Sequence, residues 1–239
     1  MSHALQKQKR VCAVVGVGPG TGAAFAQRFS SEGYAVAQLA RSTDFTSGLA
    51  ARLETSRAYA CDATDPHAVA LTFAAVAKDL GPVDTLIYNA GKGVWGSAED
   101  VTLDQFEDTW RINALGALAA AKCVIPAMKQ RGSGNIIFTG ATASRRGGTK
   151  TAAFAPAKAA QRSLAESLAR HLGPSGIHVA LIVVDGVIDE PLMRAKLPGK
   201  PDGFFVKPED IADTAVMLTH QKPSAWSFEL EARPFAEIW

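Results

Sequence analysis

Apolar positions along this chain fall into short runs that are separated by longer stretches of mixed apolar and polar residues. A short run that is apolar at nearly every position is typical of a strand buried on both faces of a parallel sheet. Strands are therefore predicted at residues 10–18, 34–41, 56–62, 83–91, 135–140 and 177–186, with a last one at 225–231.

The stretches between these strands have the spacing of amphipathic helices, in which apolar residues return every three or four positions. Asp65 and Pro66 open one of them, because aspartate caps a helix and proline fits its first turn. The predicted helices lie at residues 22–33, 65–81, 103–130, 151–173 and 207–220. Strands and helices that alternate in this way predict an α/β fold, a doubly wound parallel sheet of about seven strands with helices on both faces.

The stretch at 187–206 departs from this alternation. It holds Pro191, Pro198 and Pro201, and glycines lie among them. Clustered proline and glycine interrupt regular structure, so we expect the most irregular and mobile loop of the chain here. No linker or repeat divides the rest of the sequence, which predicts a single domain over residues 1–239.

The first predicted strand runs into a glycine-rich turn and then into a helix, within the segment VVGVGPGTGAA. Gly16, Gly20 and Gly22 lack a Cβ, which permits a tight turn and lets a ligand approach the backbone. The free N–H groups at the start of the helix, near Thr21, would then face an anion such as a diphosphate. The pattern favours a nucleotide site, and an ordinary glycine-rich loop is the alternative.

Composition and charge exclude several classes of function. The chain carries 25 basic and 23 acidic side chains for a net charge of +2, which provides no basic surface for nucleic acid. Its first residues lack the apolar core of a secretory signal, and no apolar run reaches the ~18 residues of a membrane span. Cys12, Cys61 and Cys123 are far apart, so we expect reduced thiols, a cytoplasmic location and no metal site.

Two further motifs accompany the glycine turn: YNAG at the end of the fourth strand and FAPAK in the helix at 151–173. With these motifs in this order, the chain resembles the short-chain dehydrogenase/reductase family over nearly its whole length. The resemblance implies a single NAD(P)-binding Rossmann domain. The cofactor-binding positions that it implies are Gly16, Gly20, Thr21, Gly22, Asp62, Asn89, Ala90, Gly91, Lys158 and Gly186.

The resemblance also implies roles for individual residues. Asp62 would contact the adenine, Asn113 would anchor a water molecule of a proton relay, and Lys158 would be the catalytic lysine that also holds the nicotinamide ribose. Members of the family protonate the carbonyl oxygen with a tyrosine hydroxyl and bind it with a serine hydroxyl. This chain has Phe154 and Ala141 at those two positions, and neither side chain carries a hydroxyl.

Two interpretations of these substitutions stay open. In one, the chain is a catalytically inactive regulatory protein that binds nucleotide, or a structural subunit of a mixed oligomer. In the other, it is an oxidoreductase acting on a small carbonyl or alcohol with a different proton donor, for which the candidates are Thr142, Ser144 and Tyr88. Routine hydrogen bonding to the backbone is the alternative role of these hydroxyls.

The end of the second strand indicates which cofactor is preferred. A site for NAD places an acidic residue there to bind the ribose 2′-hydroxyl, whereas this chain has Arg41 followed by Ser42. A guanidinium suits a 2′-phosphate, to which it donates charge-assisted hydrogen bonds. NADP(H) is therefore predicted over NAD(H).

The substrate is not identified by the sequence. A basic cluster of Arg145, Arg146 and Lys150 could hold an anionic substrate or be a solvated surface. Trp95 and Phe204 could line an apolar pocket or belong to the core.

The resemblance places the loop at 187–206 on the substrate side. It also implies a homodimer or homotetramer, because the helices at 103–130 and 151–173 pair across subunits in the family. The apolar cluster at residues 235–239 would favour burial against the body of the protein or against another subunit.

Overall fold

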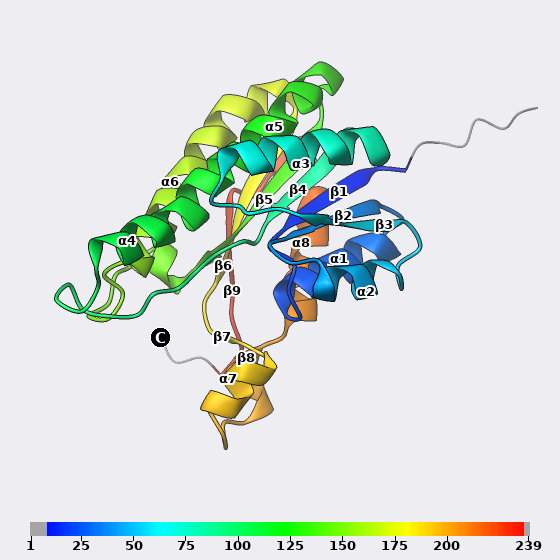
Figure 1. Ribbon diagram of the computed structural model, residues 1–239. Helices are drawn as coiled ribbons and strands as arrows, with labels where there is room; N and C mark the ends of the chain where they lie inside the picture. The colour runs from blue at the N-terminus through cyan, green and yellow to red at the C-terminus, as the bar shows by residue number, and fades with distance from the viewer. Residues whose placement is uncertain (1–8, 237–239) are drawn as a thin grey trace, which may run out of the picture.

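A computed structural model of the chain describes residues 9–236, and its centre is one sheet of seven strands (Figure 1). All neighbouring strands are parallel, and their order across the sheet is β3-β2-β1-β4-β5-β6-β9. The strands are β1 (Val11–Val15), β2 (Ala35–Ala40), β3 (Ser56–Ala60), β4 (Val83–Tyr88), β5 (Gly134–Ala141), β6 (Ile177–Val184) and β9 (Glu229–Ala232). The fold class and the parallel sheet predicted from the sequence are confirmed.

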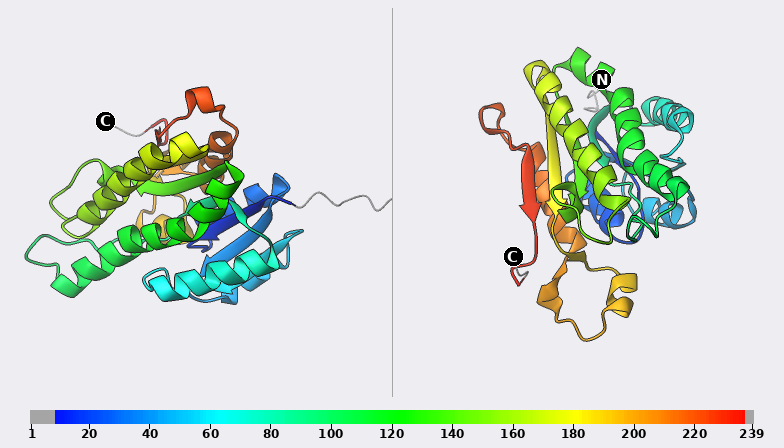
Figure 2. Two further views of the ribbon diagram at one scale, coloured as in Figure 1. Left: turned by 90° about the horizontal axis from the view of Figure 1, so that it is seen from above. Right: turned by 90° about the vertical axis from the view of Figure 1, so that its left-hand side faces the viewer.

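Helices cover both faces of this sheet, and a separate apolar cluster fills the space under each layer (Figures 1 and 2). The helices on one face are α3 (Pro66–Asp79), α5 (Gly116–Arg131) and α6 (Phe154–Leu172). The helices on the other face are α1 (Thr21–Ser31), α2 (Asp44–Ala50) and α8 (Pro208–Thr219). The strands between the layers are buried on both sides, which explains why they are apolar at nearly every position.

One helix was not predicted, and another begins at a different residue than predicted. Helix α2 has no counterpart in the prediction, because its sequence DFTSGLA contains threonine, serine and glycine, which are weak helix formers. It forms nonetheless, with Leu49 buried in the core. Helix α6 begins at Phe154, not at residue 151, and this places Pro156 in the first turn, where no backbone N–H is needed.

The long helix predicted at 103–130 is interrupted by a wider turn. It consists of α4 (Leu103–Trp110), a π-helical turn at Arg111–Leu115, and then α5. By length and composition the whole segment Leu103–Arg131 could cross a membrane, although 44% of its apolar window is buried. It packs against α3, α6, β4 and β5, as a core helix of a layered α/β fold does.

The segment at 187–206 forms a small lobe beyond the end of β6 (Figure 2). Its regular elements are β7 (Val187–Ile188), α7 (Pro191–Lys196), a 3-10 turn (Asp202–Phe204) and β8 (Phe205–Val206). The guanidinium of Arg194 holds the lobe together, because it pairs with the carboxylates of Asp189 at 2.6 Å and Asp202 at 2.8 Å. Only short regular elements occur in this segment, which the sequence predicts to be the most irregular part of the chain, and its mobility stays a prediction.

The strand order indicates where a ligand would bind, without reference to any motif. Chain connections run outward in opposite directions from β1 and β4, which are neighbours at the centre of the sheet. In doubly wound folds a crevice opens at this point, outside the carboxyl ends of the strands. Of the apolar cluster predicted at 235–239, Phe235 is exposed and residues 237–239 lie outside the described part of the chain.

Candidate functional site

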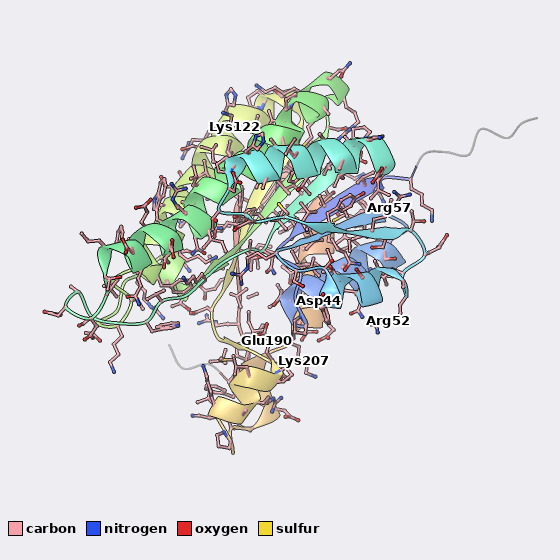
Figure 3. The ribbon with its side chains drawn as sticks, viewed as in Figure 1. Asp44, Arg52, Arg57, Lys122, Glu190 and Lys207 are labelled. Carbon is pink, nitrogen blue, oxygen red and sulfur yellow. The ribbon has the colours of Figure 1, made fainter. Side chains whose placement is uncertain are left out.

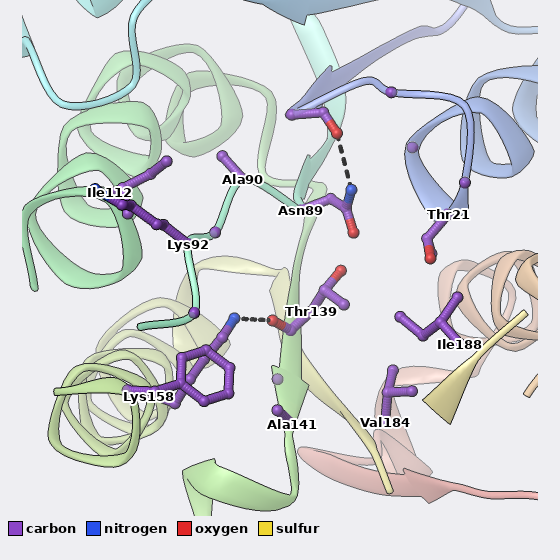
Figure 4. Close-up of a pocket in the computed structure, with 18 of the residues that line it drawn as sticks. Thr21, Asn89, Ala90, Lys92, Ile112, Thr139, Ala141, Lys158, Val184 and Ile188 are labelled. Atoms are coloured by element: carbon purple, nitrogen blue, oxygen red, sulfur yellow. Dashed lines mark hydrogen bonds between the residues drawn. The ribbon is translucent and has the colours of Figure 1, made fainter. Parts of the chain in front are cut away.

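A cavity of about 1270 Å³ opens at the carboxyl edge of the sheet, over the ends of β1 and β4 (Figure 4). Its walls come from the glycine turn, the ends of β2, β5 and β6, the start of α6 and the small lobe. The predicted site residues that line it are Gly16, Gly20, Thr21, Gly22, Arg41, Ser42, Asn89, Ala90, Gly91, Ala141, Phe154, Lys158 and Gly186. The fold therefore brings together nearly all of the positions that the sequence singled out.

The glycine turn packs directly on the end of β4. Gly16 has a φ of 91°, a conformation that favours glycine, and a Cβ there would lie 2.5 Å from the N and Cα atoms of Ala90. The side-chain amide of Asn89 donates a hydrogen bond of 2.8 Å to the carbonyl oxygen of Gly16 (Figure 4). A Cβ on Gly22 would lie 2.7 Å from the Cα of Val17, so α1 also starts in contact with the turn.

Three buried polar atoms have no hydrogen-bond partner within residues 9–236: Thr21 Oγ1 and Thr139 Oγ1 in the wall of the cavity, and Asn113 Oδ1 behind that wall. A buried polar atom is costly unless it is hydrogen-bonded, so such atoms are typical of a site that holds a ligand or water. A nicotinamide dinucleotide fits this arrangement. It offers phosphate, ribose and carboxamide groups to these atoms and to the free N–H groups at the start of α1.

Lys158 lies on α6 at the inner wall of the cavity, with its ammonium buried. The Nζ donates hydrogen bonds of 2.8 Å to the carbonyl oxygen of Thr139 and 3.1 Å to Oε1 of Gln161. Burial lowers the pKa of Lys158 to about 8, because a low-dielectric environment disfavours the charged form. An ammonium has three N–H donors, so one of them remains for a ligand.

Asn113 lies in the π-helical turn, behind Gly91, and does not itself line the cavity. Its side-chain amide donates to the carbonyl oxygens of Thr109 at 2.8 Å and Lys92 at 3.0 Å. The unpaired Oδ1 consequently faces Gly91, on which a Cβ would be 3.0 Å away. Turns of this kind often occur at functional sites, where the wider turn re-aims a side chain.

Gln161 belongs to this buried polar network, although the sequence analysis did not single it out. It is buried, and its side-chain amide donates a hydrogen bond of 3.0 Å to the carbonyl oxygen of Asn113, while its Oε1 accepts from Lys158. The signal was its position three residues after Lys158, which places both on one face of the helix. Gln161 therefore connects the two polar positions that the family resemblance had treated separately.

The apolar wall of the cavity is made by Phe154 and Trp95. Their ring centroids are 5.5 Å apart, and Trp95 is 68% exposed. Ala141 is the last residue of β5 and lines the cavity with its methyl group. Of the two alternatives left open for these aromatic residues, Trp95 lines the cavity, whereas Phe204 packs against Phe205 in the lobe and does not line it.

The hydroxyl groups considered as proton donors are engaged elsewhere. Tyr88 is fully buried, its hydroxyl donates a hydrogen bond of 2.5 Å to the carbonyl oxygen of Ile112, and burial raises its pKa. The hydroxyl of Ser144 accepts a hydrogen bond of 3.0 Å from the backbone of Ala141. Neither Tyr88 nor Ser144 lines the cavity, while Thr142 does line it but donates to the carboxylate of Asp185.

At the opposite end of the cavity lies Arg41, whose exposed guanidinium has no ion pair with the rest of residues 9–236. The pKa of Asp62 is lowered, mainly because its carboxylate accepts hydrogen bonds of 2.9 and 2.8 Å from the N and Oγ1 of Thr64, and also because Arg41 is near. Cys61 and Ala63 line the cavity, but Asp62 between them does not. Its contact with an adenine stays a prediction.

The structure separates the members of the basic cluster. Arg146 lines the cavity, with its guanidinium 4.0 Å from the carboxylate of Asp185. Arg145 pairs instead with Glu231 on β9, and Lys150 is not among the lining residues. Within residues 9–236, no group of three histidine, cysteine, aspartate or glutamate side chains is placed to hold a metal ion.

Comparison with known proteins agrees with this geometry. The short chain dehydrogenase family matches residues 10–200. The 3-oxoacyl-[acyl-carrier-protein] reductase MabA of Mycobacterium tuberculosis (strain ATCC 25618 / H37Rv) is 32% identical over 182 residues, which cover 76% of this chain and 70% of that protein. The chain therefore belongs to the short-chain dehydrogenase family, a family of oxidoreductases that bind nicotinamide cofactors.

Two solved structures match almost the whole chain. A short-chain dehydrogenase from Rhodopseudomonas palustris has a TM-score of 0.82 and 32% identity, over 95% of this chain and 99% of the other. A metagenomic short-chain oxidoreductase in complex with NADP has a TM-score of 0.81 and 25% identity, over 95% of this chain and 98% of the other. The single-domain fold is thus that of the family.

Proposed function

We propose that this chain is an NADP(H)-dependent oxidoreductase that acts on a small carbonyl compound or alcohol. The observation that carries the proposal is one continuous cavity that joins the glycine turn, Arg41 and Lys158. These features match the 2′-phosphate at the adenosine end of the dinucleotide, the diphosphate at its centre and the reacting ring at its other end. The NADP complex of a structural relative supports the same choice of ligand.

The cofactor would be held by residues along the whole cavity. The N–H groups at the start of α1, with Thr21, would bind the diphosphate. Arg41 and Ser42 would bind the 2′-phosphate, which is the group that distinguishes NADP(H) from NAD(H). When bound, the cofactor supplies hydride transfer to or from the substrate carbon.

The active site that we propose is degenerate, with Phe154 and Ala141 in place of the tyrosine and serine of the family. We assign the role of proton donor to the ammonium of Lys158, which keeps one N–H free and lies at the cavity wall. With a pKa of about 8 this group is mostly charged at neutral pH and can donate a proton to a carbonyl oxygen. A water molecule on Oδ1 of Asn113 would return the proton to Nζ from solvent.

The proposed assembly is a homodimer or homotetramer. Large apolar side chains are exposed along α4 and α5, namely Leu103, Phe106, Trp110 and Leu118. A row of this kind on one long helix is typical of a surface that is covered by a partner. A second copy of the chain is the partner that we propose.

The function is tested by NADPH oxidation against reactive carbonyls, such as diketones and quinones. Wild type is compared with the double variant Ala141→Ser, Phe154→Tyr, and Lys158→Met is the control for the lysine. Turnover by wild type that is lost in Lys158→Met supports the proposal. A silent wild type beside an active double variant would instead identify a nucleotide-binding protein that has lost its catalytic acid. Absence of NADPH binding by calorimetry would remove the proposal altogether.

A further inference from the structure

Glu190 lines the cavity from the side of the small lobe, at the junction with the body of the protein (Figure 3). It is the residue before α7, and its carbonyl oxygen accepts hydrogen bonds of 2.9 Å from the N–H groups of Met193 and Arg194. A residue in this position often caps its own helix with its side chain. The Glu190 side chain makes no such bond and extends away from α7 into the cavity.

The carboxylate of Glu190 lies on Gly20, at the start of α1. A Cβ built on Gly20 would overlap Oε1 of Glu190, and it would lie 2.6 Å from Cδ and 2.9 Å from Cγ. The space above this glycine is therefore filled by an acidic side chain. Within residues 9–236 the carboxylate has no hydrogen bond or ion pair of its own, although it is partly shielded from solvent.

The start of a helix attracts anions, because its first N–H groups are free and the helix dipole is positive there. The carboxylate of Glu190 lies beside this start, against Gly20, and a diphosphate bound to the N–H groups of α1 would meet it there. The hydroxyl of Thr21 is a second, independent sign of a ligand at this point, since it is buried and has no partner. Two anions cannot share the start of α1 without strong repulsion.

We propose that Glu190 is a built-in competitor for the diphosphate of the nucleotide, so that each binding event must displace its carboxylate from Gly20. The inference rests on the proposed function, because it requires a dinucleotide to bind in this cavity. The affinity for nucleotide is set by a residue of the small lobe, as well as by the glycine turn that holds the phosphates.

The contacts of the lobe indicate how the carboxylate leaves. The backbone of the neighbouring Asp189 donates a hydrogen bond of 2.8 Å to the carbonyl oxygen of Val206, and its carboxylate pairs with Arg194. Glu190 is thus anchored on both sides by the lobe and by α7. Neither contact involves the side chain of Glu190, so a rotation of that side chain about its own bonds would leave both contacts intact.

The test is the dissociation constant of NADPH, measured by calorimetry for wild type and for Glu190→Gln. Glutamine has nearly the same shape as glutamate and no charge, so the variant removes repulsion and keeps packing. We expect Glu190→Gln to bind NADPH on the order of tenfold more tightly. Glu190→Ala, which also empties the space above Gly20, should bind at least as tightly. Glu209→Gln, on the exposed first turn of α8, is the matched control and should not change the affinity.

A second ligand separates repulsion at Gly20 from a general change of charge. Adenosine 2′-monophosphate can reach Arg41 but has no phosphate to place at the start of α1. Its affinity should be the same for wild type and Glu190→Gln. If the variant binds both ligands more tightly by the same factor, the effect is one of overall charge, and the proposal is overturned.

The remaining outcomes are also decisive. If Glu190→Gln binds NADPH as tightly as wild type or more weakly, Glu190 does not compete with the diphosphate, and the proposed function is left intact. Binding of NADPH by none of the proteins, wild type included, overturns both. A selective gain for NADPH in Glu190→Gln, absent from Glu209→Gln, supports the assignment.

Discussion

Lys158 and Gln161 are joined by a hydrogen bond of 3.1 Å within α6, from the lysine Nζ to the glutamine Oε1. The partner is a neutral amide, so no carboxylate offsets the cost of burying the ammonium at this site. The same amide holds the backbone of Asn113 at 3.0 Å. Gln161 thus fixes the position of the lysine while leaving its proton weakly held.

The first prediction concerns the pH dependence of reductive turnover. The ammonium of Lys158 has a pKa of about 8 and is the proposed acid, so the rate should be constant below that pH. Above it the rate should fall by about tenfold per pH unit, because only the charged form donates a proton. Gln161→Glu places a carboxylate against the lysine and should move the fall to higher pH. A rate that stays level to pH ~10 in wild type contradicts this role for Lys158.

The second prediction concerns stability. The pKa of Lys158 is about 8 in the folded chain and 10.5 without the fold, so the folded state binds fewer protons between these values. The free energy of unfolding should therefore rise with pH across this window, by about 3 kcal/mol for this group. Urea unfolding of wild type and Lys158→Met at several pH values isolates the contribution. The prediction is wrong if wild type and Lys158→Met differ in their free energy of unfolding by the same amount at pH 8 and at pH 10.5.

The third prediction compares two glycines of one turn. A Cβ on Gly22 would lie 2.5 Å from the carbonyl oxygen of Gly16 and 2.7 Å from the Cα of Val17, and these backbone atoms cannot move freely. Gly22→Ala should lower the free energy of unfolding by about 1–3 kcal/mol and weaken NADPH binding. Gly18→Ala is the matched control, since a Cβ there meets nothing within 4 Å. Equal behaviour of the two variants in thermal unfolding would show that the turn is not tightly packed.

The fourth prediction concerns the choice of cofactor. Arg41→Asp removes the proposed partner of the 2′-phosphate and supplies an acceptor for ribose hydroxyls. The ratio of NADPH to NADH affinity should fall by about tenfold to a hundredfold, the range expected for a lost charge-assisted hydrogen bond. Arg52→Asp makes the same change of charge nearby but outside the cavity, and should leave the ratio unchanged. An unaltered ratio in Arg41→Asp would assign the preference to another residue.

The fifth prediction concerns assembly. Trp110→Lys places a charge in the middle of the exposed apolar row on α4 and α5 and should dissociate the proposed oligomer. The molar mass from light scattering would then fall to that of one chain. Leu71→Lys changes an exposed apolar side chain on α3 and should leave the molar mass as in wild type. A wild type that is already a monomer rules out the assembly.

Most of the fold was predictable because its signals are local. A buried strand is apolar along its length, and the glycine turn is contiguous in sequence, so each could be recognised without knowledge of the rest. Helix α2 was missed because its residues are weak helix formers, and it is stabilised by burying Leu49 in the core. The lobe at 187–206 was missed because Arg194 orders it through contacts with residues that precede and follow it.

Some residues of the candidate site could likewise be predicted from local sequence, and others could not. Gln161 could have been found, since residues three apart share a face of a helix. The position of Glu190 could not, because it depends on how the lobe lies against Gly20 near the other end of the chain. Tyr88 illustrates the opposite error. Its place in the sequence suggested a donor near the cofactor, but alternation along β4 points its side chain into the core.

The π-helical turn at Arg111–Leu115 has a consequence for insertions and deletions. Such a turn accommodates one more residue than an α-helix of the same length. Loss of a single codon within it would let α4 and α5 join as one regular helix, with the packing on both sides preserved. Asn113 or its replacement would then be rotated by roughly 100° around the helix, away from Gly91. One in-frame deletion would thus remove Asn113 from its position facing Gly91 and leave the layers on both sides of the turn in place.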